Sequence, residues 1–84
     1  MYDHELKTFI QAILTDTISP SQLTERLIHT IDWTKIYESK DQLTTGAFFA
    51  LKHYATGEED TSDIEWKYFI NCFDGKCKYD MDQK

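Results

Sequence analysis

The chain has 84 residues, of which 40% are hydrophobic and 14% are aromatic, and its formal net charge at pH 7 is −6. This length predicts one domain, residues 1–84, with a modest core, and the apolar content argues against a wholly disordered chain. The acidic balance and the single arginine, Arg26, argue against binding to DNA, RNA or anionic membranes, because phosphates are recognised by clustered basic side chains. The charge favours a basic protein partner instead.

The first half of the chain predicts two amphipathic helices. Apolar side chains recur at helical spacing at Leu6, Phe9, Ile10, Ile13 and Leu14. The first helix is expected to end near Asp16 and Thr17. Ser19, Pro20 and Gln22 then give the capping-box signature of a second helix, which we expect to run to about Trp33. The side chains expected to be buried on that helix are Leu23, Leu27, Ile28 and Ile31.

The second half predicts two further helices. Residues 34–40 are less periodic, and only a short helical turn is expected there. A longer helix is expected to begin near Asp41 and to end at Gly57, and Gly46 within it suggests close packing against another backbone. Its apolar residues are Leu43, Ala47, Phe48, Phe49, Ala50, Leu51 and Tyr54.

The last helix is expected to begin after Ser62, with Glu65 in the capping-box position, and to end at Asp74 and Gly75. Its apolar stripe is Trp66, Phe69, Ile70 and Phe73. Residues 76–84 are charged and are expected to fray. The pattern as a whole predicts an all-α protein, a small antiparallel four-helix bundle.

Five carboxylates fall within eight residues without any lysine or arginine, and they are Glu58, Glu59, Asp60, Asp63 and Glu65. We call residues 58–65 the acidic segment. The positive end of the last helix explains Asp63 and Glu65, whereas the preceding three carboxylates mainly repel one another. A docking surface for a basic protein is therefore preferred to the alternative, a solvated loop. Tyr54 and Trp66 border the segment and are candidate contact residues, although core packing is the simpler assignment for each taken singly.

The sequence predicts no catalytic residues, no metal site and no cofactor. It contains no glycine-rich phosphate loop and no nucleophile elbow, and its three histidines are not spaced as metal ligands. We therefore do not expect an enzyme.

The cellular location is expected to be cytoplasmic. The chain has no apolar run of the roughly 18 residues that a membrane span requires, and residues 1–5 lack the basic and apolar regions of a signal peptide. In that compartment Cys72 and Cys77 would be reduced. They are interpreted as structural thiols, with a disulfide or a metal role left open as the alternative.

Two stretches of the chain resemble the bacteriocin immunity proteins, above all those of the colicin D type. Residues 18–28, Ile-Ser-Pro-Ser-Gln-Leu-Thr-Glu-Arg-Leu-Ile, resemble the start of that family's second helix. Residues 46–54, Gly-Ala-Phe-Phe-Ala-Leu-Lys-His-Tyr, followed by residues 58–60, resemble its third helix and acidic exit. The DNase-colicin type is similar in layout but carries Tyr-Tyr-Pro where this chain has His53-Tyr54-Ala55. The resemblance covers residues 5–73.

This resemblance implies an inhibitor that binds a cytotoxic nuclease, and for the colicin D type a tRNA-cleaving one. The carboxylates of the acidic segment would occupy the electropositive phosphate track of the enzyme, and Tyr54 and Trp66 would add contact area. One alternative is a phage- or plasmid-encoded nucleic-acid mimic that binds a host defence or transcription protein. Another is a plain helical adaptor that dimerises through Phe48 or Phe49. We expect a monomer or a weak homodimer.

Overall fold

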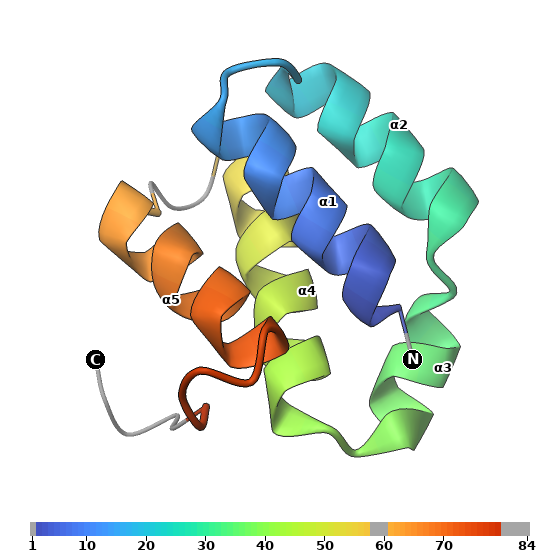
Figure 1. Cartoon of the computed structure of the whole chain (residues 1–84). Helices are drawn as coiled ribbons and strands as arrows, with labels where there is room; N and C mark the ends of the chain where they lie inside the picture. The colour runs from blue at the N-terminus through green and yellow to red at the C-terminus, as the bar shows by residue number, and fades with distance from the viewer. Residues whose placement is uncertain (1, 58–60, 80–84) are drawn as a thin grey trace.

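The computed structural model describes residues 2–57 and 61–79, and every regular element in those two ranges is a helix. The helices are α1 (Asp3–Leu14), α2 (Pro20–Thr30), α3 (Trp33–Ser39), α4 (Gln42–Thr56) and α5 (Asp63–Phe73), as Figure 1 shows. The prediction of an all-α protein is confirmed. The two described ranges contain five helices where the sequence predicts four, and the additional one, α3, lies where only a short helical turn is expected.

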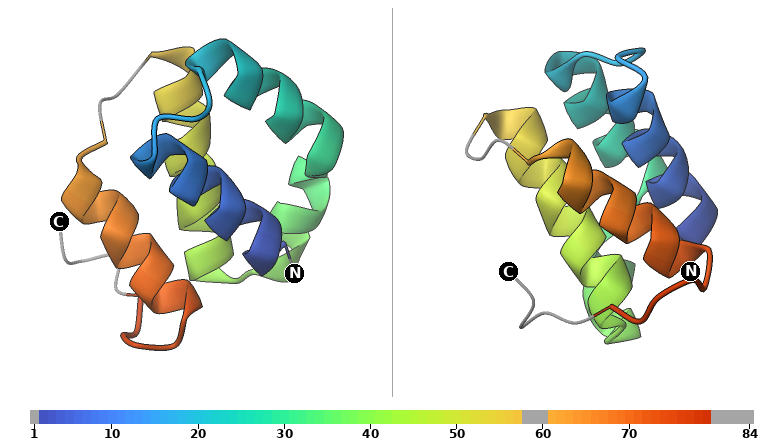
Figure 2. Two further views of the ribbon diagram at one scale, coloured as in Figure 1. Left: turned by 45° about the horizontal axis from the view of Figure 1, so that its top comes forward. Right: turned by 60° about the vertical axis from the view of Figure 1, so that its left-hand side comes forward.

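The longest helix, α4, is the central element of the fold. It packs against each of the other four helices, and α1 also packs along α5. In Figure 1, α5 and α2 lie on opposite sides of α1, with α4 behind it. Both views of Figure 2 keep α1 and α5 side by side. Several neighbouring helices thus cover α4, which explains why this helix carries more apolar residues than one neighbour could bury.

Each helix contributes a fully buried side chain to one apolar core. The largest of these side chains are Trp66, Leu6, Ile10, Leu23, Ile36 and Leu51. Burial of such side chains is the main stabilising term of a small helical protein. The predicted core position Ile28 is wrong, because this side chain is 73% exposed. Since α2 packs chiefly on α4, the covered strip of α2 carries Leu23 and Leu27, and it is continued by the buried C-cap residue Ile31.

The helix ends follow the capping residues of the sequence. The Ser19 hydroxyl accepts from the Gln22 amide at 3.3 Å, and the Gln22 side chain accepts from the Ser19 amide at 3.0 Å, which completes the predicted capping box. Gly57 ends α4 with a φ of 77°, the left-handed conformation that favours glycine. Ser62 accepts from the Glu65 amide at 3.3 Å and so supplies the serine half of the second predicted box.

The fifth helix arises because the chain turns at Ile31 and Asp32. The prediction that the second helix reaches Trp33 is wrong: α2 ends at Thr30, and Ile31 adopts an extended conformation. The Asp32 carboxylate then accepts from the Thr34 amide at 3.0 Å and caps a new helix. Ile36 is fully buried and anchors this short helix to the core.

The segment after α5 is held in place as far as Tyr79. The Tyr79 ring stacks on Phe69 with ring centroids 5.6 Å apart, and the Tyr68 hydroxyl donates to the Lys78 carbonyl at 3.1 Å. An aromatic side chain thus holds residues 76–79 against α5, and the expectation that the chain frays from residue 76 stays a prediction. Residues 80–84 lie outside the described part of the chain.

Gly46 owes its place in α4 to the same tyrosine. A Cβ atom at Gly46 would lie 2.9 Å from the Tyr79 Cζ atom, closer than side chains tolerate. The predicted close approach is thus present, but the prediction that a backbone makes it is wrong: an aromatic ring from the C-terminal segment fills the space.

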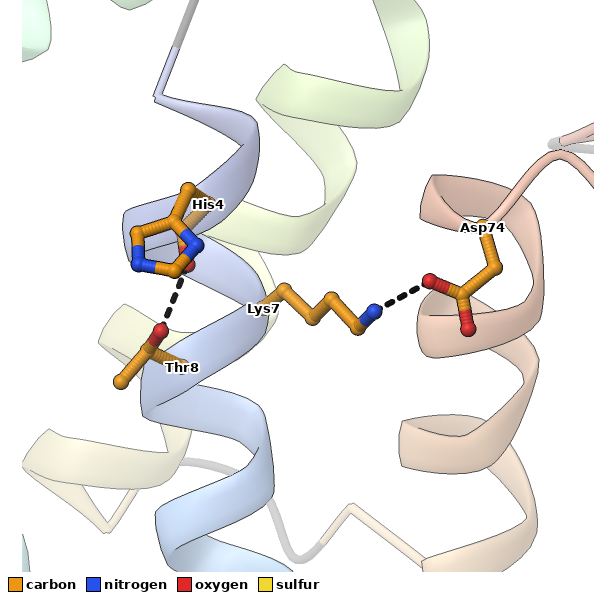
Figure 3. A network of polar contacts seen from close by, with 4 residues as sticks. All are labelled: His4, Lys7, Thr8 and Asp74. Atoms are coloured by element: carbon orange, nitrogen blue, oxygen red, sulfur yellow. Dashed lines mark hydrogen bonds and ion pairs between the residues drawn. The ribbon is translucent and has the colours of Figure 1, made fainter.

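An ion pair links the first half of α1 to the C-cap residue of α5. The Lys7 ammonium donates to the Asp74 carboxylate, as Figure 3 shows. Both side chains remain partly exposed, so solvent screening leaves the pair a minor term in stability. Its position matches the packing of α1 along α5.

Candidate protein-binding surface

The acidic segment is described from Thr61 onward. Glu58, Glu59 and Asp60 lie outside the described residues, whereas Asp63 and Glu65 stand in the first turn of α5 and are exposed. Neither carboxylate forms an ion pair with another residue of the described ranges. Their negative charge lies at the positive end of the helix dipole, which stabilises both of them there. The start of α5 is therefore a negatively charged and accessible surface.

Ile64 is the residue of this surface that the sequence analysis missed. It lies between the two carboxylates and is 80% exposed, the highest exposure among the large apolar side chains described. The sequence does contain a signal for this exposure. Ile64 is out of helical phase with Phe69 and Phe73, so it points away from the side of α5 that these residues share. The result is an apolar side chain surrounded by charge.

Trp66 does not belong to this surface. Its side chain is fully buried, so the indole is part of the core and is unavailable as a contact residue. Tyr54 lies against it edge-on, with ring centroids 5.8 Å apart and an interplanar angle of 87°. Tyr54 is half-buried, so this residue remains partly accessible to a partner near the end of α4.

The buried indole also carries a polar group that no described residue satisfies. The Trp66 Nε1 atom has no hydrogen-bond acceptor among the described residues. A buried donor without an acceptor costs roughly 1–3 kcal/mol. The apolar bulk of the indole outweighs this cost because a buried tryptophan removes a large area from water.

A second surface, which we call the apolar face, is formed by Ile28, Trp33 and Tyr37. These side chains are 73%, 60% and 43% exposed, respectively. They border a groove of about 750 Å³ between α2, α3 and α4, whose floor includes Leu27 and Phe48. Trp33 and Tyr37 meet edge-on with ring centroids 5.7 Å apart.

The apolar face differs from the adaptor surface expected from the sequence. Phe48 is buried, and Phe49 is half-buried under contacts with Tyr37 and His53. The side chains that remain available are those of α2 and α3 instead. The reason is that α4 is enclosed by its neighbours, while α2 and α3 each have an uncovered side.

The side-chain chemistry of the described ranges offers no obvious centre for metal binding. Within residues 2–57 and 61–79, no group of three or more histidine, cysteine, aspartate or glutamate side chains is placed to hold a metal ion. Among those same residues, no helix has the length and apolarity needed to cross a membrane. What the geometry does present is one charged and one apolar surface.

Known proteins give no further guide to either surface. Comparison with models of protein families, with curated proteins and with solved structures finds no match.

Proposed function

We propose that this chain is an inhibitor of a basic nuclease, of the kind that the bacteriocin immunity proteins of the colicin D type represent. The observation that carries the proposal is the start of α5, where Ile64 is 80% exposed between two exposed carboxylates. Protein interfaces combine an apolar centre with a polar rim, and the start of α5 supplies both. Tyr54 and the remaining carboxylates of the acidic segment would extend this surface.

The charge of the chain supports a nuclease as the target. A nuclease binds a polyanion, so its active site must be electropositive. A chain with a net charge of −6 is drawn to such a site, and the attraction speeds association most at low ionic strength. Carboxylates in the phosphate track would then exclude the nucleic acid. Inhibition of this type needs no catalytic group, and it would operate in the cytoplasm of the producing cell.

The direct test is capture followed by an activity assay. The immobilised chain is exposed to lysate of the producing cell at low salt, bound protein is eluted with raised salt and identified, and the eluate is assayed for cleavage of tRNA and DNA. We expect one basic nuclease whose activity falls when free chain is added. Capture of a DNA-binding complex without nuclease activity would contradict the proposal and favour the nucleic-acid mimic.

The role of the acidic segment is tested with two charge-matched variants. Asp63→Asn/Glu65→Gln and Glu25→Gln/Glu38→Gln each remove two exposed carboxylates, the first pair from α5 and the second from α2 and α3. We expect the first variant to bind the nuclease about tenfold more weakly, a change of about 1.4 kcal/mol. The control should change binding by less than about threefold, because distant surface charges contribute little. Equal losses in the two variants would show that only net charge matters.

The adaptor alternative depends on a different observation, the exposure of Ile28 and Trp33 on the apolar face. A second copy of the chain would cover these side chains in a homodimer. Light scattering distinguishes the alternatives, since apolar contact is far less sensitive to salt than contact between charges. A dimer that persists at high salt would support the adaptor.

A further inference from the structure

The two cysteines, 5 residues apart in sequence, meet in space at the end of α5. The Cys72 and Cys77 sulfur atoms lie 3.3 Å apart, and both residues are free thiols. Cys72 is buried in the last turn of α5, whereas Cys77 is exposed in the segment that follows. Spacing alone does not bring two side chains together, so the sequence predicts structural thiols and leaves a disulfide open as an alternative.

A helix-ending motif sets this approach. Gly75 adopts a φ of 77°, and its amide donates to the Cys72 carbonyl at 3.1 Å. The Lys76 amide donates to the Asn71 carbonyl at 2.9 Å. These two bonds form a Schellman motif, which reverses the chain direction directly after the helix. Cys77 is thereby returned to the side of α5 that carries Cys72.

We propose that Cys72 and Cys77 are a redox-active dithiol that closes to an intramolecular disulfide on reaction with a hydroperoxide. The Cys77 thiolate attacks the peroxide, the O–O bond breaks, and a sulfenic acid forms as water or alcohol leaves. The Cys72 sulfur then attacks the Cys77 sulfur as its thiol proton is lost, the S–O bond breaks, and the hydroxide takes up this proton and leaves as water. The two thiols together lose two protons and two electrons, and the hydroperoxide accepts them.

The environments of the two sulfur atoms assign these roles. Cys77 is exposed, so the oxidant reaches it first. Burial, followed by the hydrogen bond with Cys77, raises the pKa of the Cys72 thiol to about 11. Cys72 is therefore protonated at neutral pH and protected from direct attack, and it acts only once the sulfenic acid stands beside it.

Formation of the disulfide would add a second covalent link, between the side chains of Cys72 in α5 and Cys77 in the segment that follows. That segment is now held by the Tyr68–Lys78 hydrogen bond and by the Tyr79 ring, which packs on Phe69 and over Gly46. A disulfide restricts the unfolded chain and so raises stability, although a loop this short gives less than a long one. We expect the thermal midpoint of the oxidised chain to rise by roughly 5 to 15 °C.

The test uses the full chain, hydrogen peroxide at neutral pH, intact mass and a thiol titration under denaturing conditions. The expected product is a monomer that has lost two hydrogen atoms and both free thiols, recovers them with dithiothreitol, and melts at a higher temperature. Persistence of both thiols, addition of oxygen without loss of hydrogen, or a disulfide-linked dimer would overturn the proposal. An unchanged melting temperature would overturn the attachment of the C-terminal segment.

Two variants assign the order of reaction. Cys72→Ser is expected to stop at the sulfenic acid, which dimedone traps as a stable adduct on residue 77. Cys77→Ser should leave the buried thiol intact under the same conditions. Because Cys77 is exposed, Cys77→Ser is expected to fold normally. This variant therefore tests the order of reaction even if Cys72→Ser is unstable. Rapid oxidation of Cys72 in the Cys77→Ser variant would contradict the assignment.

Discussion

The start of α5 and the apolar face both expose large apolar side chains to solvent. At the start of α5 the neighbouring side chains are negatively charged, whereas on the apolar face they are mainly uncharged. Ile64 stands between carboxylates, whereas Ile28 and Trp33 border a groove of mainly apolar side chains. A charged surface acts over about 10 Å and weakens with salt, while an apolar surface acts only on contact. The two surfaces therefore suit different partners, and experiments can separate them.

The largest expected effect distinguishes a tryptophan in the core from one on the apolar face. Trp66 is fully buried and Trp33 is 60% exposed. We expect Trp66→Ala to lower the free energy of unfolding by about 3–5 kcal/mol, since it opens a cavity, and Trp33→Ala to lower it by about 1 kcal/mol or less. Urea denaturation measures both.

A third variant refines that comparison. Trp66→Phe keeps much of the apolar volume and removes the indole N–H that lacks an acceptor among the described residues. It should cost clearly less than Trp66→Ala. Equal losses for Trp66→Ala and Trp33→Ala would contradict the difference in burial between the two tryptophans.

An intermediate effect is expected from the two exposed isoleucines. Ile64→Ser should weaken nuclease binding by about tenfold, because contact with the partner buries an apolar side chain of this size. Ile28→Ser should leave it unchanged, and neither substitution should lower stability appreciably, since both side chains are largely exposed. Calorimetry at two salt concentrations measures binding.

Salt dependence provides the control for this pair. The loss from Ile64→Ser should persist at high salt, whereas the loss from Asp63→Asn/Glu65→Gln should shrink as the charges are screened. A nuclease that binds Ile28→Ser poorly and Ile64→Ser normally would move the interface to the apolar face.

The smallest expected effect is on stability and concerns Ser62, the N-cap residue of α5. Ser62 accepts from the Glu65 amide, and Ser62→Ala removes that bond at the start of α5. We expect the free energy of unfolding to fall by about 1 kcal/mol or less. Ser19→Ala, which breaks a box formed in both directions, should cost more. Thermal denaturation of the two variants gives the order, and the reverse order would show that α5 depends on its cap more than α2 does.

Local sequence patterns predict the long helices well. Apolar spacing and capping residues locate α1, α4 and α5, because these signals act within one or two turns of the chain. The break between α2 and α3 is predicted too late in the chain, at about Trp33 instead of after Thr30, since Ile31 and Trp33 continue an apolar pattern, while Asp32 caps a new helix instead. The spacing of apolar residues carries no information on the hydrogen bond between the Asp32 carboxylate and the Thr34 amide.

The surfaces are harder to predict because they depend on which neighbours cover a helix. Ile28 and Trp66 both fit apolar stripes, yet one is exposed and the other buried, and the arrangement around α4 decides between them. The contact of Tyr79 with Gly46 joins residues far apart in sequence and leaves no local signal. The charges of Asp63 and Glu65 were recognisable, whereas the exposure of Ile64 required the structure.

The central position of α4 has a consequence for how the chain is made on the ribosome. The helices that emerge first, α1 to α3, pack chiefly against α4 or α5, so they have little to fold onto until residue 56 has been synthesised. Until then Leu6, Leu23 and Ile36 remain open to water and to other molecules. The nascent chain is therefore most in need of chaperone protection in its first half, and a stall in translation before α4 would leave a fragment prone to aggregation.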